Sequence, residues 1–299
     1  MSRLPELALI TCSPGSGSTA YGYLLNLHPS VLCLEESALL DPEGEVTLRD
    51  KLQRGVLASK PSVLLPGTPD LGIWSEDAAG VMRELAGGQV HDIPALAASL
   101  VGISQKRDAC LVVEKFPNLG NRFCSVLIQR KIKAIFLTRH PFGAISSIIR
   151  KMEAPLASSI HLGHMATPGL NWGPMVEGGG YDSSLLDLMT LQYMSCITEL
   201  EAALATGLPV AILRYEQLLT SPVAVYQETC RHLGLTWTPD IAQLFRGLCL
   251  DTSKATAWER QLSPRYQAAI LRTLSSCSGL QLLTSLYPEV RQPLSNRGV

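Results

Sequence analysis

Residues 7–27 combine an apolar run, a turn rich in glycine and serine, and a helical pattern, which strongly limits the folds open to this chain. Residues 7–12 have the composition of a buried β-strand. After the turn, Tyr23, Leu24 and Leu27 recur at the spacing of an amphipathic helix. The sequence therefore predicts a strand that passes through a tight turn directly into a helix.

The turn itself has the composition of a phosphate-binding loop. Backbone N–H groups at the start of the expected helix lack partners within the helix and favour an anion. The hydroxyl groups of Ser16, Ser18 and Thr19 add donors, and Gly15 and Gly17 let the backbone approach the anion closely. A Walker A loop would carry lysine directly before the serine or threonine, and this chain has none there. We expect a phosphate site of a different kind from that of an ATPase.

Strand and helix patterns alternate along the chain, which favours an α/β fold with a parallel sheet covered by helices. We expect strands at 7–12, 109–113, 133–138 and 208–213. We expect helices at 19–27, 91–104, 120–130, 142–151, 185–206, 221–233, 238–246 and 263–278. Proline and glycine break the patterns at 40–76 and 154–182, so we interpret residues 1–299 as one domain with two insertions.

Composition excludes several classes of protein. The chain of 299 residues is 46% apolar and 17% charged, which indicates a globular protein with a substantial core. Its net charge of −1 gives no general attraction to nucleic acid or to a membrane surface. No apolar run is long enough to span a membrane, and the residues before the first expected strand leave no length for a secretory signal. Eight scattered cysteines without a Cys-x-x-Cys pair indicate reduced core thiols and no zinc site, so we expect a cytoplasmic protein.

A second polar segment follows the apolar strand at 133–138. Arg139 stands at the end of this strand, and Ser147 lies eight residues later on the expected helix. Ligands of open α/β sheets bind beyond the carboxyl ends of the strands, so Arg139 and the serine-rich loop should share one edge of the sheet. An arginine there can clamp a phosphate through two hydrogen bonds. The alternative is an arginine held in an ion pair at the end of its strand.

Two further segments complete the pattern. Arg214, Tyr215 and Glu216 follow the strand expected at 208–213. Near the C-terminus, a basic loop containing Lys254 leads into a helix whose start is marked by Ser263 and Pro264.

These four segments, in this order and spacing, resemble the sulfotransferases that use 3′-phosphoadenosine 5′-phosphosulfate (PAPS). The resemblance implies the sulfotransferase fold, with a P-loop-like parallel sheet flanked by helices. It implies that residues 14–19 bind the 5′-phosphosulfate group and that Arg139 and Ser147 bind the 3′-phosphate. It also places Tyr215 near the adenine and makes residues 254–264 the loop that covers the nucleotide.

The stretch from Leu27 to Ser37 is similar to the tyrosylprotein sulfotransferases and related bacterial enzymes. The resemblance implies that Glu36 is the general base, with the neighbouring Glu35 as the rival, and that Lys115, in a Lys-x-Pro segment, is the catalytic lysine. Both types of residue suit sulfuryl transfer, because the ammonium group can neutralise charge on the leaving oxygen and the carboxylate can accept the proton of the acceptor. Without the resemblance, both residues could equally form ordinary surface ion pairs.

Gly15 departs from the family pattern, which usually has arginine or lysine at this position. The loss of a charge at a transition state costs several kcal/mol. Lys115 or Lys254 could compensate, the enzyme could be slow, or the protein could bind nucleotide without turnover. We favour compensation.

Histidines and aromatic residues in the second insertion indicate a function less specifically. His161 and His164 lie at helical spacing but lack a carboxylate or cysteine companion, which argues against a metal site. Residues 161–181 include Trp172 and three successive glycines, a composition that suits either a lid over the acceptor or a disordered insertion.

Taken together, the sequence predicts a PAPS-dependent sulfotransferase that requires no metal. The expected acceptor is a hydroxyl group, or secondarily an amine, of a small molecule, as in the tailoring of a secondary metabolite. No nucleic-acid or membrane partner is expected, and the oligomeric state stays open. The alternatives are a P-loop-type nucleotide phosphotransferase and a non-catalytic protein that binds PAPS or its product 3′-phosphoadenosine 5′-phosphate (PAP).

Overall fold

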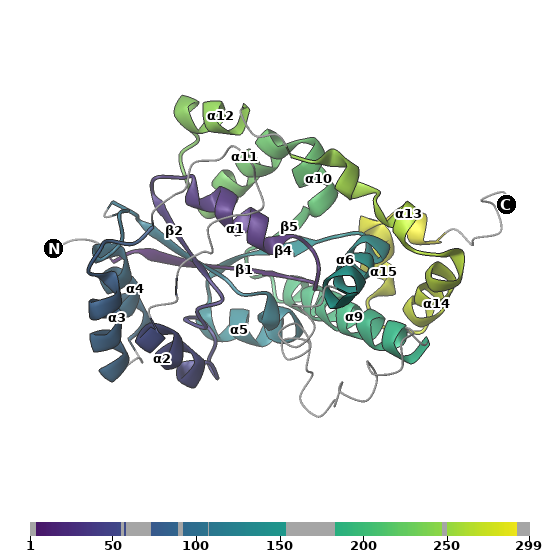
Figure 1. The fold of residues 1–299 in the computed structure, drawn as a ribbon, viewed down its shortest axis with the longest axis horizontal. Coiled ribbons are helices and arrows are strands. Elements are labelled where there is room, and N and C mark those ends of the chain that lie inside the picture. Colours follow the sequence, from purple (N-terminus) through teal and green to yellow (C-terminus); the bar gives the residue numbers. More distant parts are fainter. Residues whose placement is uncertain are drawn as a thin grey trace.

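The computed structural model describes residues 4–54, 57, 73–88, 92–106, 108–153, 183–246 and 250–291. Its centre is a five-stranded parallel sheet with the strand order β2-β3-β1-β4-β5 (Figure 1). The strands are β1 (Glu6–Cys12), β2 (Val31–Glu35), β3 (Leu111–Lys115), β4 (Lys133–Thr138) and β5 (Val210–Arg214). The expected α/β fold with a helix-flanked parallel sheet is confirmed.

Helices cover both faces of this sheet. Figure 1 shows α1, α10 and α11 on one side and α2, α5 and α9 on the other. The helices within the described residues are α1 (Ser18–Asn26), α2 (Glu45–Arg54), α3 (Ala78–Gly87), α4 (Ile93–Gly102), α5 (Phe123–Arg130), α6 (Pro141–Glu153), α9 (Ser183–Ala205), α10 (Tyr215–Thr220), α11 (Pro222–Leu233), α12 (Pro239–Arg246), α13 (Trp258–Gln261), α14 (Pro264–Ser275) and α15 (Leu280–Leu286). Short 3-10 turns are η1 (Pro117–Arg122), η2 (Thr252–Ala255) and η3 (Pro288–Arg291).

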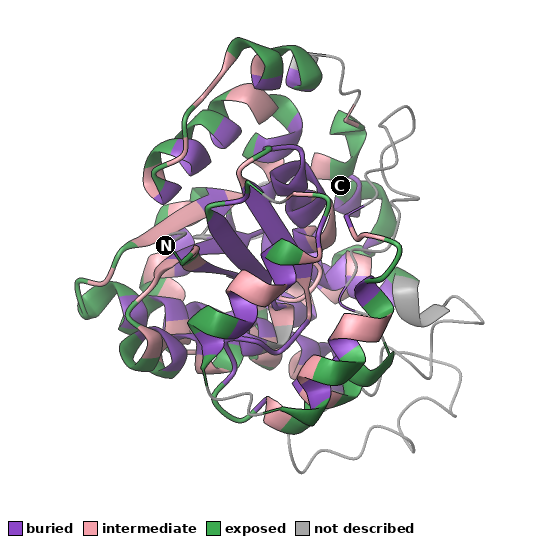
Figure 2. Cartoon of the chain, turned by 90° about the vertical axis from the view of Figure 1, so that its left-hand side faces the viewer, coloured by how far each residue is buried: buried purple, intermediate pink, exposed green. Residues whose placement is uncertain are grey.

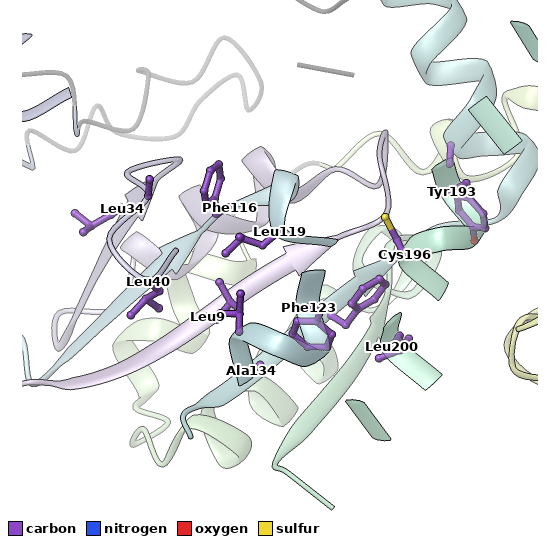
Figure 3. Packing of buried hydrophobic residues seen from close by; sticks show 14 of the residues in the cluster. Leu9, Leu34, Leu40, Phe116, Leu119, Phe123, Ala134, Tyr193, Cys196 and Leu200 are labelled. Atoms are coloured by element: carbon purple, nitrogen blue, oxygen red, sulfur yellow. The ribbon is translucent and has the colours of Figure 1, made fainter. Parts of the chain in front are cut away.

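Strands β1 to β4 are buried on both faces over most of their length, which explains why they read as continuous apolar runs, whereas β5 at the edge of the sheet is mostly of intermediate exposure (Figure 2). Successive side chains point to opposite faces, so Leu9 joins the cluster under α5 and α9 while Ile10 joins the cluster under α1 and α11. Figure 3 shows Leu9 packing in the first cluster with Phe123 and Leu200. A fully buried leucine contributes about 1.5–3 kcal/mol, so these two layers account for much of the stability.

Most expected elements are present with small shifts of their ends. The strands expected at 7–12 and 133–138 match β1 and β4 closely, whereas β3 begins and ends two residues later than expected. The helix expected from residue 263 begins at Pro264, and the Ser263 side chain accepts a hydrogen bond from the Tyr266 N–H as its N-cap.

Several elements of the structure were not expected, namely β2, α2, α3, α10, α13 and α15. The apolar run of β2 is short and was considered only as part of a motif. The expectation of irregular structure throughout 40–76 is wrong for α2, where Leu48 and Leu52 alone are buried. This helix is dominated by charged residues, and its Arg49–Glu45 ion pair of 3.0 Å supports the helical spacing.

The sheet topology positions the candidate site. Because all five strands run parallel, the segments that follow them emerge at one edge. In the register of the paired strands, Lys115 of β3 lies beside Glu35 of β2, and Thr138 of β4 lies beside Arg214 of β5. The serine-rich loop after β1 therefore meets Glu36, Lys115, Arg139 and Tyr215 at the same edge.

The seven described cysteines are free thiols, and Cys12, Cys33, Cys196 and Cys230 are buried. Within the described ranges, no cluster of three or more potential metal-ligating side chains is found. None of the helices in that part of the chain has both the length and the apolar character needed to cross a membrane.

Candidate functional site

The loop between β1 and α1 presents buried hydroxyl groups and a helix N-terminus. Ser13 and Ser16 are buried, and their Oγ atoms lie 2.6 Å apart in a hydrogen bond. Gly17 is the N-cap of α1, and no side chain caps the helix. The first N–H groups of α1 are therefore available to an anion, together with the hydroxyl groups of Ser18 and Thr19.

Close packing explains both glycines of this loop. Gly15 and Gly17 have φ angles of 76° and 82°, in the left-handed region that glycine adopts without strain. A Cβ atom at Gly15 would lie 2.5 Å from the backbone oxygen of Ala144 on α6, and one at Gly17 would lie 2.5 Å from the Tyr215 ring. Position 15 thus has no space for a side chain unless the backbone of α6 shifts.

Arg139 contacts the same loop from the neighbouring strand end. Its Nη1 atom donates to the backbone oxygen of Gly15 at 3.2 Å, and its Nη2 atom donates to the backbone oxygen of Lys254 at 2.9 Å. The structure therefore brings together the loop, Arg139 and the C-terminal segment, although they are more than 100 residues apart. The guanidinium contacts carbonyl oxygens, and no ion pair of Arg139 occurs within the described ranges.

Arg139 has more hydrogen-bond donors than the described residues around it have acceptors for. The residue is 5% exposed, and its buried Nε atom has no hydrogen-bond partner among the described residues. Burial lowers the pKa of Arg139, an effect that the nearby Tyr215 and Glu216 oppose. The guanidinium carbon lies 4.4 Å from the centroid of the Tyr215 ring, a cation–π contact. A buried cation with an unused donor is well suited to a bound anion.

Ser147 and Lys254 are less closely tied to this centre. Ser147 lies two turns into α6 and is partly exposed, while the adjacent Ser146 donates to Gln261 Oε1 at 2.7 Å. The side chain of Lys254 is exposed, and the contact of this residue with Arg139 is made by its backbone oxygen.

Lys115 and Glu36 form an ion pair beside the loop. The distance from Lys115 Nζ to Glu36 Oε1 is 3.2 Å, and the same Nζ lies 3.5 Å from Thr19 Oγ1 at the start of α1. The Lys115 side chain is fully buried, whereas 37% of the Glu36 side chain is exposed. A buried ammonium group at the serine-rich loop thus faces a carboxylate that is partly exposed to solvent. Glu35 lies beside Lys115 in the strand register, so both glutamates are close to the lysine.

Two charged residues near this pair were missed by the sequence analysis. Lys51 of α2 is half-buried, and its Nζ lies 6.0 Å from the centroid of the Phe116 ring. Burial lowers the pKa of Lys51, and the charge of Glu36 opposes that shift. Glu114 lies directly before Lys115 and is fully buried. Lys51 stands in a segment expected to be irregular, but the charged Glu114 within an apolar strand was a visible signal.

Other expected features fall outside the described residues. These are the His161 and His164 pair and the possible lid at 161–181, with Trp172 and the three glycines.

Comparison with solved structures identifies this arrangement as the sulfotransferase fold. The chain is similar to the sulfotransferase domain of the Synechococcus PCC 7002 olefin synthase, with a TM-score of 0.58 and 18% identity over 91% of this chain and 94% of that one. It is also similar to the sulfotransferase domain from the curacin biosynthetic pathway, with a TM-score of 0.54 and 18% identity over 96% of this chain and 99% of that one. A sulfotransferase from Alicyclobacillus acidocaldarius has a TM-score of 0.50 and 14% identity over 99% of this chain and 98% of that one. No family model and no curated protein matches the sequence.

Proposed function

We propose that this protein transfers the sulfuryl group of PAPS to a hydroxyl group of a small molecule, with an amine as the second candidate acceptor. One observation carries the proposal: the Lys115–Glu36 ion pair lies at a serine-rich loop that Arg139 also contacts. A positive group beside a helix N-terminus suits a phosphate leaving group, and an accessible carboxylate suits a general base. The sulfotransferase fold of the chain is consistent with this chemistry.

The nucleotide would be held at two points. The N–H groups at the start of α1, with Ser16, Ser18 and Thr19, would bind the 5′-phosphosulfate group. Arg139 would bind the 3′-phosphate, which offers the charged acceptor that its buried Nε lacks among the described residues. Tyr215, which already stacks on Arg139, would lie near the adenine.

The transfer step uses the ion pair. Glu36 accepts the proton of the acceptor O–H group as the acceptor oxygen forms its bond to sulfur, and the bond between sulfur and the 5′-phosphate oxygen breaks. Lys115 and the α1 N-terminus stabilise the charge that develops on that leaving oxygen. A well-placed general base contributes about 10²–10⁴-fold in rate. No metal ion is needed for these charges to balance.

The acceptor is proposed to be a biosynthetic intermediate or secondary metabolite. Two of the similar solved structures are domains from an olefin synthase and from the curacin biosynthetic pathway. They support an acceptor from small-molecule biosynthesis but do not name it.

Thermal unfolding with added nucleotides tests the proposal. PAP should raise the melting temperature in a concentration-dependent manner, and ATP with Mg²⁺ should not, because only PAP carries a 3′-phosphate for Arg139. Arg139→Ala should lose most of the response to PAP, while the control Arg83→Ala, an exposed residue of α3, should keep it.

Radiolabelled PAPS incubated with a panel of hydroxyl and amine acceptors then separates an enzyme from a binding protein. Stabilisation by PAP without transfer to any acceptor would favour the non-catalytic alternative. Stabilisation by ATP with Mg²⁺ but not by PAP would favour a nucleotide phosphotransferase and overturn the proposal.

A further inference from the structure

Glu114 is a fully buried carboxyl group that the proposed transfer step does not use. It precedes Lys115 at the end of β3, and both side chains have no exposed surface. Because side chains alternate along a strand, Lys115 points toward α1 while Glu114 points to the opposite face of the sheet. A charged group in that layer is costly unless its oxygens are fully hydrogen-bonded.

Three of the four residues after Glu36 supply those hydrogen bonds. Glu114 Oε1 accepts from Ser37 Oγ at 2.6 Å and from the Leu39 N–H at 3.0 Å. Its Oε2 accepts from the Leu40 N–H at 2.5 Å. Burial raises the pKa of Glu114, and these donors act in the opposite direction. One carboxyl group thus holds the entire segment 37–40.

The held segment contains backbone conformations that L-residues rarely adopt. Glu36 and Ala38 have φ angles of 52° and 62°. Non-glycine residues in this left-handed region cost of order 1–3 kcal/mol each and persist only where the surroundings enforce them. On the other side, the Glu36 N–H donates to the Lys115 backbone oxygen at 2.7 Å. Glu36 is therefore fixed from both sides by β3, through the backbone of Lys115 and through the side chain of Glu114.

Further contacts keep the end of the segment in place. Arg130 Nε donates to the Leu40 backbone oxygen at 3.0 Å, and Arg122 forms an ion pair of 2.8 Å with Asp41. Leu40 is buried in the same cluster as Leu9 (Figure 3). Because this end is anchored independently, the loss of Glu114 should release residues 36–39 without unfolding the layer.

We propose that Glu114 is a positioning residue, which holds the loop 36–40 so that the Glu36 carboxylate faces Lys115 and the acceptor. This inference rests on the proposed function, in which Glu36 is the base. Glu114 itself touches neither nucleotide nor acceptor, since it lies on the other face of the sheet. The two adjacent residues of β3 therefore have different roles: Lys115 acts at the leaving group, and Glu114 orients the base.

A double-mutant cycle tests this role. Glu114→Gln places an amide N–H₂ group among donors and should lower kcat by about 10²-fold, the usual cost of a base displaced by about 1 Å. The Kd for PAP should stay unchanged, because the loop after β1 and Arg139 are untouched. In the Glu36→Gln background, Glu114→Gln should cause no further loss of kcat. The matched control is Glu84→Gln, at an exposed position of α3.

Equal losses of kcat with and without Glu36 would overturn the inference, because they would indicate a general structural role. If Glu114→Gln does not fold, the variant Ser37→Ala tests the same role. It removes one of the three donors to Glu114 and should lower kcat by about three- to ten-fold, again only when Glu36 is present. Wild-type kcat in a folded Ser37→Ala protein would then contradict the proposal.

A readout without turnover separates this inference from the proposed function. The NMR signal of Lys115 Nζ should shift in Glu36→Gln, shift in the same direction in Glu114→Gln, and not shift further in the double variant. If no acceptor is ever sulfated but this pattern holds, the proposed function fails while the positioning by Glu114 stands. An unchanged Lys115 signal in Glu114→Gln would overturn the positioning role.

Discussion

Lys115 and Glu36 differ strongly in exposure, and this difference defines what each can do. The lysine is fully buried and keeps its contacts with Glu36 and Thr19, whereas the carboxylate retains a solvent-facing side. A buried ammonium group without a counter-charge would be strongly destabilising, so Glu36 stabilises the lysine in the nucleotide-free protein. In the proposed function, a phosphate bound at the loop would add a negative charge beside Lys115, so that Glu36 would no longer be needed as its counter-charge and could accept a proton.

Replacement of Lys115 should therefore separate binding from transfer. We expect Lys115→Ala, and the volume-conserving Lys115→Met, to lower kcat by about 10²–10³-fold, the range observed when one transition-state donor is removed. The Kd for PAPS should change little, because the remaining loop donors and Arg139 still hold the nucleotide and its bridging oxygen does not yet carry the charge that Lys115 stabilises. Titration calorimetry with PAPS and a radiolabel transfer assay measure the two quantities. Turnover at the wild-type rate in either variant would overturn the assignment of Lys115.

The two neighbouring glutamates can be distinguished in the same assay. Glu36→Gln should lower kcat by about 10²–10⁴-fold, whereas Glu35→Gln, the matched control, should retain most of the activity. A larger loss for Glu35→Gln would transfer the base role to that residue.

Gly15 illustrates how packing can exclude a residue that the chemistry would favour. We expect Gly15→Ala to lower the melting temperature and weaken PAP binding, because the φ of 76° and the contact with Ala144 both oppose a Cβ atom. A left-handed conformation alone costs an alanine about 1–2 kcal/mol. The control Gly80→Ala lies in the interior of α3 with no atom within 4 Å, and should stabilise by about 0.5–1 kcal/mol. A fully stable Gly15→Ala protein that binds PAP normally would contradict this packing argument.

At the scale of elements, the site depends on how α1 is held. The last carbonyl groups of a helix lack partners within it. Lys106 supplies a partner for one of them and ties the end of α1 to the chain that follows, because its Nζ donates to the backbone oxygens of Asn26 in α1, of His28 and of Val31 in β2. Its positive charge also suits the C-terminal end of the helix dipole. The N-terminus of the same helix bears the proposed phosphate site, so Lys106 fixes the helix from the opposite end.

The variant Lys106→Met tests how strongly the position of α1 depends on Lys106. We expect a loss of about 2–4 kcal/mol in the free energy of unfolding, since three buried carbonyl groups lose a charged donor. Urea unfolding measures it, with Arg83→Met on the surface of α3 as the control. PAP should recover part of the lost stability, because it binds only the folded protein. A midpoint equal to that of the control would show that α1 is held by other contacts.

At the scale of the whole molecule, local sequence patterns predicted four of the five strands of the sheet, all except β2, and the edge at which the candidate site lies. Both ends of β4 were predicted at the residues where the structure has them. Because ligands of parallel sheets bind beyond the carboxyl ends of the strands, the sequence also predicted that Arg139 lies beside the serine-rich loop. The structure confirms that juxtaposition across 124 residues. The nucleotide-binding and catalytic roles themselves stay predictions.

Features that depend on tertiary contacts could not be predicted in this way. The partners of Glu114 are 74 to 77 residues away, so the sequence offers only a charge within an apolar strand. The α2 helix has few apolar residues because little of it is buried, which removes the periodicity that would identify it. The lack of space at Gly15 arises from α6, which is remote in the sequence.

A crystal structure of the protein with bound PAP tests the central claim most directly. Our account predicts one nucleotide that bridges both sites, with its 5′-phosphate on the N–H groups at 16–19 beside Lys115. Its 3′-phosphate should accept hydrogen bonds from Arg139, whose Nε then gains a partner. A nucleotide bound elsewhere, or one whose 3′-phosphate lies away from Arg139, would contradict the account.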